Sequence, residues 1–155
     1  MFYDSPSFKK TTAEDTAFAR AELTYESKCP NYIYLNDLQL THLPSVLFKC
    51  YFLDSIDLNN NQLNCISPEI EKFNKLEWLN LTGNNLTTLP KTISTITSLE
   101  TLDLSGNPLI SLPIELEKLP NLKYISIDAD KIHLLPQNLR EFASSPKKNI
   151  PSVFY

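Results

Sequence analysis

Two histidines and three cysteines are the side chains of this chain that could supply a nucleophile, a general base or a transition-metal ligand. They are His42, His133, Cys29, Cys50 and Cys65. The short motifs that usually carry such chemistry, H-E-x-x-H, C-x-x-C and G-x-S-x-G, do not occur. The two glycines are too few for a glycine-rich phosphate-binding loop. The sequence therefore offers little support for a catalytic or metal-binding site.

One pair among these residues could still act together. Cys65 follows His42 by one full period of the repeat described below, so the two could lie on adjacent turns. A histidine beside a cysteine can take the thiol proton and make the sulfur a nucleophile. No third residue orients this histidine, and no cleft is implied. We interpret the two as unrelated loop residues and predict a protein that is not an enzyme and has no cofactor or metal.

The secondary-structure elements that position these side chains belong to a sequence motif that recurs along the chain. It is clearest in "LNLTGNNLTTLP" at residues 79–90, and it returns one period later as "LDLSGNPLISLP" at 102–113. The same pattern stands one period earlier as "IDLNNNQLNCIS" at 56–67. Two further copies flank these, at residues 33–44 and 125–136. Self-similarity at a fixed period outweighs local secondary-structure propensity.

Composition limits the kind of protein further. The chain has 155 residues, 42% of them hydrophobic and 21% charged, which fits one globular domain. A net charge of −4 argues against a nucleic-acid-binding surface. The odd, sparse cysteines do not indicate a disulfide framework, and we find no secretory signal or transmembrane-length apolar run. We expect a cytoplasmic protein in a reducing compartment, with Cys50 in the core and Cys65 exposed. We expect it to contact neither nucleic acid nor a membrane.

The spacing within one repeat predicts its backbone. Leu79 and Leu81 are two positions apart, so their side chains share one face of a short strand. Asn84 follows where the chain must turn, and its side chain can bond backbone groups that the turn leaves unpaired. Pro90 then begins a segment, residues 91–98, whose isoleucines are three apart, as in a helical or 3₁₀ turn.

Stacking would align the polar residues of successive turns into an asparagine ladder, formed by Asn61, Asn84 and Asn107 with Asp130 as its last rung. In the first copy Leu38 stands at this position, so the ladder should begin one repeat later. The second copy has Ser67 where the register predicts proline, with Pro68 one place later, and we expect its helical segment to be reshaped.

The whole motif, L-x-x-L-x-L-x-x-N-x-L-x-x-L-P, resembles the leucine-rich repeat (LRR) family in its 23-residue Leu-Pro form. This resemblance implies an α/β fold: a right-handed solenoid of five repeats with a parallel sheet on its concave side. A single repeat cannot bury its own leucines, so the copies must stack. We expect residues 1–29 to form an N-terminal tail and helical cap, with the helix over 12–25. Residues 30–142 would form the repeats and 143–155 a C-terminal tail.

On such strands the residues between the leucines point to the concave side. We predict that the partner-binding residues are Tyr32, Tyr34, Asp57, Asn59, Trp78, Asn80, Asp103, Tyr124 and Asp128. Trp78, the single tryptophan, should be exposed in the central row, and Asp54, Glu77 and Glu100 add carboxylates beside it. Aromatic side chains dominate interface hot spots, and carboxylates favour a basic partner. The alternative is that strand-favouring aromatics and solubilising acids fill exposed sheet positions.

The resemblance implies a non-catalytic protein–protein interaction module, and we expect a monomer whose partner carries a basic patch. The sequence is also similar to short LRR effectors of intracellular bacteria, of the Legionella kind, and its C-terminal tail resembles a type IV secretion signal. On that interpretation the protein serves bacterial virulence in a host–pathogen interaction and is secreted into the host-cell cytoplasm. Two alternatives stay open: an interaction fragment of a larger LRR ubiquitin-ligase effector, or an intracellular LRR scaffold or regulator.

Overall fold

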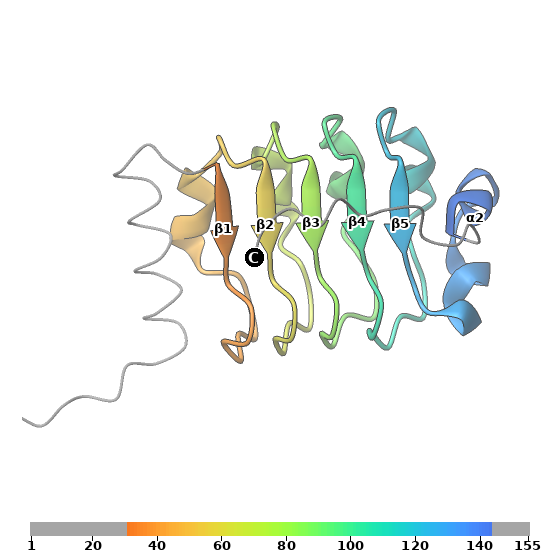
Figure 1. Ribbon diagram of the computed structural model, residues 1–155, viewed down its shortest axis with the longest axis horizontal. Coiled ribbons are helices and arrows are strands. Elements are labelled where there is room, and N and C mark those ends of the chain that lie inside the picture. Colours follow the sequence, from red (N-terminus) through yellow and green to blue (C-terminus); the bar gives the residue numbers. More distant parts are fainter. Residues whose placement is uncertain (1–30, 144–155) are drawn as a thin grey trace, which may run out of the picture.

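A computed structural model of the protein describes residues 31–143, with the side chains of 31–140. One parallel sheet, in chain order, contains β1 (Tyr32–Tyr34), β2 (Ser55–Asp57), β3 (Trp78–Asn80), β4 (Thr101–Asp103) and β5 (Tyr124–Ser126) (Figure 1). The helical cap predicted over residues 12–25 and the tail predicted from residue 144 onward lie outside the described residues.

The strand register follows the repeat period of the sequence. The central column of the sheet is apolar throughout and consists of Ile33, Ile56, Leu79, Leu102 and Ile125. All its members are buried, with at most 6% of the residue surface exposed. A slip of one residue would turn this column toward solvent, so its burial holds the strands in register.

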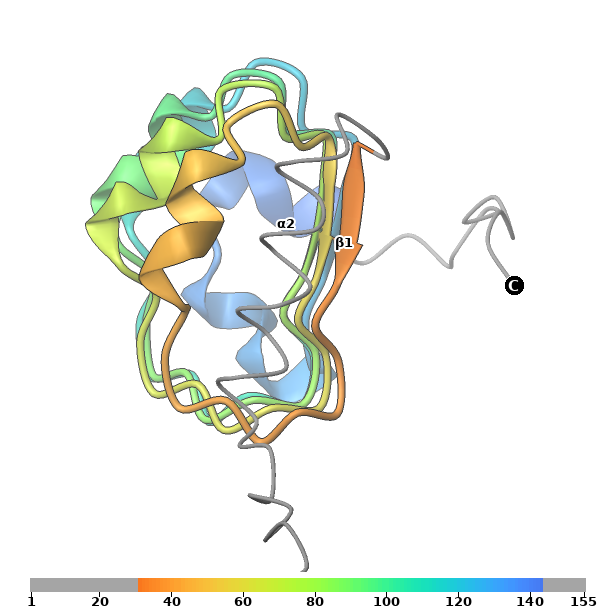
Figure 2. The same cartoon turned by 90° about the vertical axis from the view of Figure 1, so that its left-hand side faces the viewer.

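A row of 3₁₀ helices lies across the core from the sheet (Figure 2). These are η1 (Ser45–Lys49), η2 (Pro68–Lys72), η3 (Lys91–Thr95) and η4 (Ile114–Lys118). Proline stands directly before three of them, at Pro44, Pro90 and Pro113, with φ between −63° and −70°. Because the proline ring fixes φ near this value, it sets the direction in which each helical turn begins. The prediction of a 3₁₀ turn after Pro90 is confirmed.

The helix of the second repeat is not reshaped, so that expectation was wrong. η2 has the same length and register as its neighbours. Ser67 takes the place of the proline, and its Oγ accepts a hydrogen bond from the backbone N–H of Glu69 at 3.2 Å. This cap, with Pro68 at the first helical position, orders the start of the helix in place of a preceding proline.

The core lies between the sheet and the 3₁₀ helices. Leu79 and Leu81 enter it from the strand side, Leu86 from the loop, and Ile93 and Ile96 from η3 and its end. None of the five exposes measurable area. Complete burial of one such side chain stabilises the fold by about 1.5–3 kcal/mol, and equivalent residues repeat the contribution in the neighbouring turns.

The predicted asparagine ladder is present in three buried rungs, Asn61, Asn84 and Asn107. The Asn84 side-chain amide donates to the carbonyl oxygens of Leu81 and Leu58, both at 3.0 Å. Its Oδ1 accepts the backbone N–H of Leu63 at 3.1 Å. The other two rungs bond their own turn and the preceding one in the same way. The ladder therefore satisfies backbone groups that burial would otherwise leave unpaired.

Asp130 is not a further rung, so this part of the prediction was wrong. Its side chain is 73% exposed, and it lies in η5 (Ala129–Leu134), which begins shortly after β5. A carboxylate has no N–H to donate to the carbonyl groups that a rung must bind. After η5 comes α2 (Gln137–Ala143), which packs beside β5 at the end of the described solenoid (Figure 1).

The position before Leu38 and before each of the three rungs shows where the turn pattern stops. Asp37, Asn60, Gly83 and Gly106 stand at equivalent positions and have φ of 58°, 53°, 66° and 69°. This left-handed backbone is open to glycine, tolerated by asparagine and aspartate, and costly for other residues. The next equivalent position holds Ala129, and the chain there enters η5 instead.

Candidate functional site

The residues predicted to bind a partner lie on one surface, the side of the sheet away from the 3₁₀ helices, which we call the concave face. Seven of them are strand residues on either side of the buried central column: Tyr32, Tyr34, Asp57, Trp78, Asn80, Asp103 and Tyr124. The other two, Asn59 and Asp128, follow β2 and β5 at equivalent positions. Side chains alternate along a strand, so these flanking residues point away from the core.

An aromatic column runs across the concave face. Tyr32, Trp78 and Tyr124 occupy the same position on β1, β3 and β5, with the small residues Ser55 and Thr101 between them. Trp78 is half-buried rather than exposed, which corrects the expectation. It lies on the central strand, whereas Tyr32 and Tyr124, on the outer strands, are 36% and 50% exposed. The exposed aromatic area therefore lies at the two ends of the face.

The two tyrosines of β1 form a pair. The ring centroids of Tyr32 and Tyr34 are 5.1 Å apart, and the ring planes are tilted by 50°. Tyr34 also lies across from Asp57 in the parallel register. Burial, followed by the charges of Tyr32 and Asp57, raises the pKa of Tyr34 above its ordinary value, so its hydroxyl stays protonated and able to donate a hydrogen bond at neutral pH.

Asp57 and Asn59 hold each other in place. Asp57 Oδ1 accepts the backbone N–H of Asn59 at 3.0 Å and its side-chain amide at 2.9 Å. Burial raises the pKa of the Asp57 carboxyl, the hydrogen bonds from Asn59 oppose that rise, and the nearby charge of Asp37 adds to it. The pair presents a fixed carboxylate near one end of the concave face, with little conformational freedom left to lose on binding.

Other predicted residues have partners within the solenoid. Asn80 Oδ1 accepts the backbone N–H of Thr82 at 3.0 Å, as Asp57 does from Asn59 one turn earlier. Asp128 accepts the backbone N–H of Gly106 on both carboxylate oxygens, at 3.1 and 3.0 Å. Asp128 therefore helps to join the fifth turn to the fourth, a structural role that the sequence reasoning did not assign to it.

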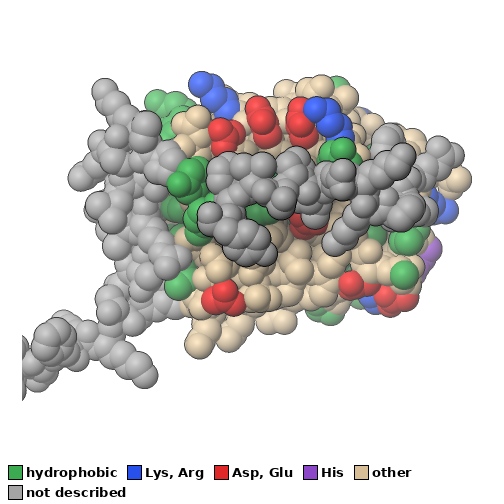
Figure 3. Space-filling view, viewed as in Figure 1, with side chains coloured by type: hydrophobic (Ala, Val, Ile, Leu, Met, Phe, Trp, Pro, Cys, Tyr) green, Lys and Arg blue, Asp and Glu red, His purple; other side chains and the backbone are tan. Residues whose placement is uncertain are grey.

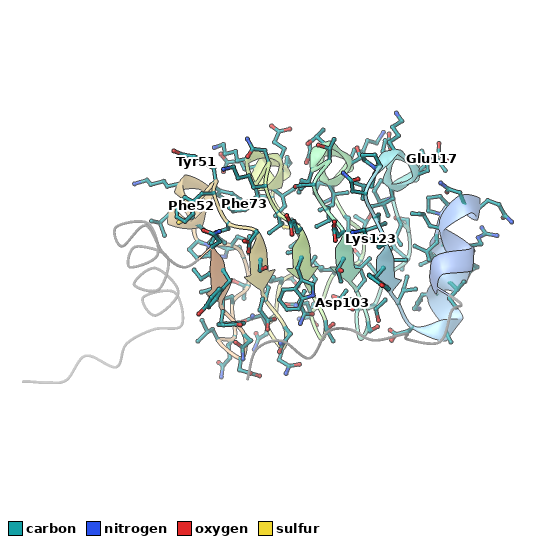
Figure 4. All side chains as sticks on the ribbon, turned by 45° about the horizontal axis from the view of Figure 1, so that its top comes forward. Tyr51, Phe52, Phe73, Asp103, Glu117 and Lys123 are labelled. Carbon is teal, nitrogen blue, oxygen red and sulfur yellow. The ribbon has the colours of Figure 1, made fainter. Side chains whose placement is uncertain are left out.

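A line of carboxylates borders the concave face where the strands begin, and we call it the acidic row: Asp54, Glu77 and Glu100 (Figure 3). Each stands one residue before its strand, and backbone hydrogen bonds connect Glu77 to Asp54 and Glu100 to Glu77. Lys123 stands at the next equivalent position (Figure 4). Its Nζ lies 2.7 Å from Glu100 Oε1. This hydrogen bond raises the pKa of Lys123, which stays charged at neutral pH.

The structure does not assemble a catalytic or metal centre from the residues that it describes. Cys65 is exposed and Cys50 is buried, as predicted, and burial raises the pKa of the Cys50 thiol. His42 is exposed, with its Nδ1 3.0 Å from Thr41 Oγ1. Within residues 31–143 there is no group of three histidine, cysteine, aspartate or glutamate side chains able to hold a metal. No helix in the same range is long and apolar enough to cross a membrane.

Sequence comparison identifies a known repeat. The profile described as "Leucine rich repeat" matches residues 53–109 and 74–132, which together cover just over half of the chain. No curated protein is detectably similar in sequence.

Solved structures share the fold. A Shigella effector LRR domain superposes with a TM-score of 0.63 and 24% identity over 79% of this chain. The Leptospira interrogans LRR protein LIC12759 superposes with a TM-score of 0.53 and 23% sequence identity over 73% of this chain. A third structure is the LRR ectodomain of the Arabidopsis thaliana receptor kinase GASSHO1/SCHENGEN3 in complex with Casparian strip integrity factor 2. It superposes with a TM-score of 0.50 and 35% sequence identity over 56% of this chain. The chain spans 50%, 37% and 11% of these three proteins, so it matches part of each.

Proposed function

Because the chain belongs to the leucine-rich repeat family, we propose that it is a non-catalytic interaction module that binds a protein partner on its concave face. The observation that carries this proposal is the composition of that face. It combines an aromatic column, formed by Tyr32, Trp78 and Tyr124, with the carboxylates of Asp57 and Asp103, all held in the strand register. Aromatic side chains with fixed polar neighbours are the usual centres of protein interfaces.

The partner we propose carries a basic patch. The acidic row, Asp57 and Asp103 put negative charge across β2, β3 and β4, and Lys123 adds one positive charge beside β5. Such a field speeds the approach of a basic surface and disfavours an acidic one. The same field disfavours nucleic acid, whose phosphates would meet carboxylates on this face.

A capture experiment tests the proposal. The tagged full chain and its Trp78→Ala variant are incubated with cell lysate, and the retained proteins are identified by mass spectrometry. Ile114→Ala is the matched control, because Ile114 is 58% exposed and lies on η4, on the opposite side. We expect a protein that wild type and Ile114→Ala retain and Trp78→Ala loses, with thermal melts showing all three folded. Equal retention by all three would remove the concave face from the proposal.

We further propose that the module works as an effector in the cytoplasm of a host cell. The fold is shared with a Shigella effector LRR domain, and this likeness supports the proposal at the level of the fold alone. A reporter fusion tests it: the chain, fused to a calmodulin-dependent adenylate cyclase, is expressed in a bacterium that carries a type IV secretion system. Cyclic AMP should rise in infected cells and stay at background when the secretion system is deleted; background levels in both would reject the effector role.

A further inference from the structure

We propose that residues 144–155 of the chain fold back over its own concave face and compete there with a protein partner. The segment has the sequence "SSPKKNIPSVFY", with two lysines, two aromatic residues and no acidic side chain. The contact between the segment and the face is independent of the proposed function. Its effect on partner binding rests on that function, because the segment and the partner would use the same surface.

The first argument is the place from which the segment starts. α2 ends at Ala143 and packs beside β5, so the segment begins at one end of the sheet. Neighbouring strands are about 4.8 Å apart, so the path from β5 to β1 is about 19 Å long. Twelve extended residues span up to about 40 Å. The segment is therefore long enough to cross the whole sheet without being fully extended.

The second argument is charge complementarity. The concave face carries Asp57 on β2 and Asp103 on β4, and the acidic row borders it. Lys147 and Lys148 are the charged side chains of the segment, and they follow the end of α2 by four and five residues. This is a reach of up to about 17 Å, which is enough to bring the lysines from beside β5 to the carboxylates of the face. Opposite charges favour this contact.

The third argument is the burial of Trp78. This side chain is half-buried, although its neighbours in the aromatic column, Ser55 and Thr101, are small. Within the described residues no ring contact involves the indole. The column therefore supplies no large side chain that covers Trp78. A segment with apolar side chains that lies across the face would supply one.

The fourth argument is the order of the side chains along the segment. Starting from β5, the path meets the carboxylates of β4 and β2 and then Tyr32 and Tyr34, which are 36% and 37% exposed on β1. The segment presents its lysines first and Phe154 and Tyr155 last. Aromatic rings pack well against one another in tilted or offset arrangements. The order of cationic and aromatic residues therefore matches the order in which the face presents their partners.

Charge and tethering decide between the segment and a second copy of the chain. A second copy would bring another acidic face, in a protein of net charge −4, against this one. A tethered segment meets its own face at an effective concentration of the order of millimolar. The chain's own segment is therefore the occupant that the face favours.

Photo-crosslinking in the full chain tests the contact. A p-benzoylphenylalanine residue replaces Phe154, the protein is irradiated in dilute solution, and the crosslinked peptides are mapped by mass spectrometry. We expect crosslinks within one molecule to peptides that contain β1, β2 or β3. Crosslinks to the 3₁₀ helices alone would overturn the proposal. Crosslinks between molecules that grow with protein concentration would overturn it in favour of a second copy.

Trp78, the single tryptophan, gives an independent measurement. Lys147→Glu/Lys148→Glu should release the segment and make acrylamide quench the fluorescence of Trp78 about twofold more strongly, because the face is then mostly uncovered. Lys49→Glu/Lys118→Glu is the matched control, because it changes the net charge equally at exposed positions on η1 and η4. It should leave the quenching as in wild type. Equal quenching of all three proteins would overturn the proposal.

Failure of this inference differs from failure of the proposed function. In the capture experiment, Lys147→Glu/Lys148→Glu should retain about threefold more partner than its control, because a covered face lowers the apparent affinity by the fraction that is uncovered. Equal retention by these two variants would overturn the competition. If Trp78→Ala also retains the partner, the proposed function fails, whereas the crosslinks from position 154 would be unchanged.

Discussion

Asn84 donates its side-chain amide to the carbonyl oxygen of Leu58, 26 residues earlier in the chain, at 3.0 Å. This buried bond joins two turns of the solenoid. It makes the stability of one turn depend on the turn before, as expected when repeats are stabilised through their neighbours.

The first prediction concerns this rung. Asn84→Ala should lower the free energy of unfolding by about 2–4 kcal/mol, because it leaves the carbonyl groups of Leu58 and Leu81 and the N–H of Leu63 buried without the side-chain partner. Urea denaturation followed by circular dichroism measures the change. Asn85→Ala is the control, because Asn85 is exposed next to the rung, and its effect should stay within about 0.5 kcal/mol. Equal losses for the two variants would contradict a stabilising ladder.

The second prediction concerns the left-handed position before the rung. Gly83→Ala should cost about 1–2 kcal/mol, because φ is +66° and the added Cβ would stand 2.7 Å from Asn60 Oδ1. Gly106→Ala should cost a similar amount, because its φ is +69° and its Cβ would meet the backbone nitrogen of Gly83 at 3.3 Å. Thermal unfolding measures both, and a variant as stable as wild type would show that the turn does not need this conformation.

The third prediction concerns pH. The pKa of Asp57 in the folded protein is raised above the ordinary 3.8, so the folded state holds this proton more tightly than the unfolded state does. The resulting stabilisation is complete below about pH 3.8 and is lost as pH rises through the raised pKa. The Asp57→Asn side chain cannot bind this proton, so the stability of the variant relative to wild type should increase as the pH rises above 3.8. Denaturation curves at several pH values test this, and a constant difference would contradict it.

The sequence predicted the repeated elements well because their causes are local and recur. Leu79 and Leu81 must share one face of a strand, Asn84 must satisfy a buried turn, and Pro90 must begin a turn; equivalent requirements return in the neighbouring repeats. The strand positions, the three asparagine rungs and the exposure of Cys65 followed from that period.

The departures came from residues whose role depends on their neighbours in space. Ser67 could replace a proline because its hydroxyl caps the next helix, an effect that the spacing alone did not indicate. Asp130 matched the period but could not donate the hydrogen bonds of a rung, and Ala129 before it does not favour a left-handed backbone. Trp78 proved half-buried, because the repeat spacing predicts the side to which a strand residue points and not how much of it is exposed. The end of the turn pattern at Ala129 could have been predicted by asking two questions of each aligned position. These are whether its side chain can donate a hydrogen bond and whether its residue type tolerates a positive φ.

The claim at the centre of this account is that a partner contacts the concave face, and photo-crosslinking from defined positions tests it most directly. A p-benzoylphenylalanine residue is placed at Tyr124, 50% exposed on β5, or at Ile114, 58% exposed on η4, and the folded proteins are irradiated in cell lysate. We expect a discrete crosslinked protein from position 124 that is absent from position 114 and is suppressed by an excess of the unlabelled chain. Adducts from position 114 alone, or the same adducts from both positions, would contradict binding on the concave face.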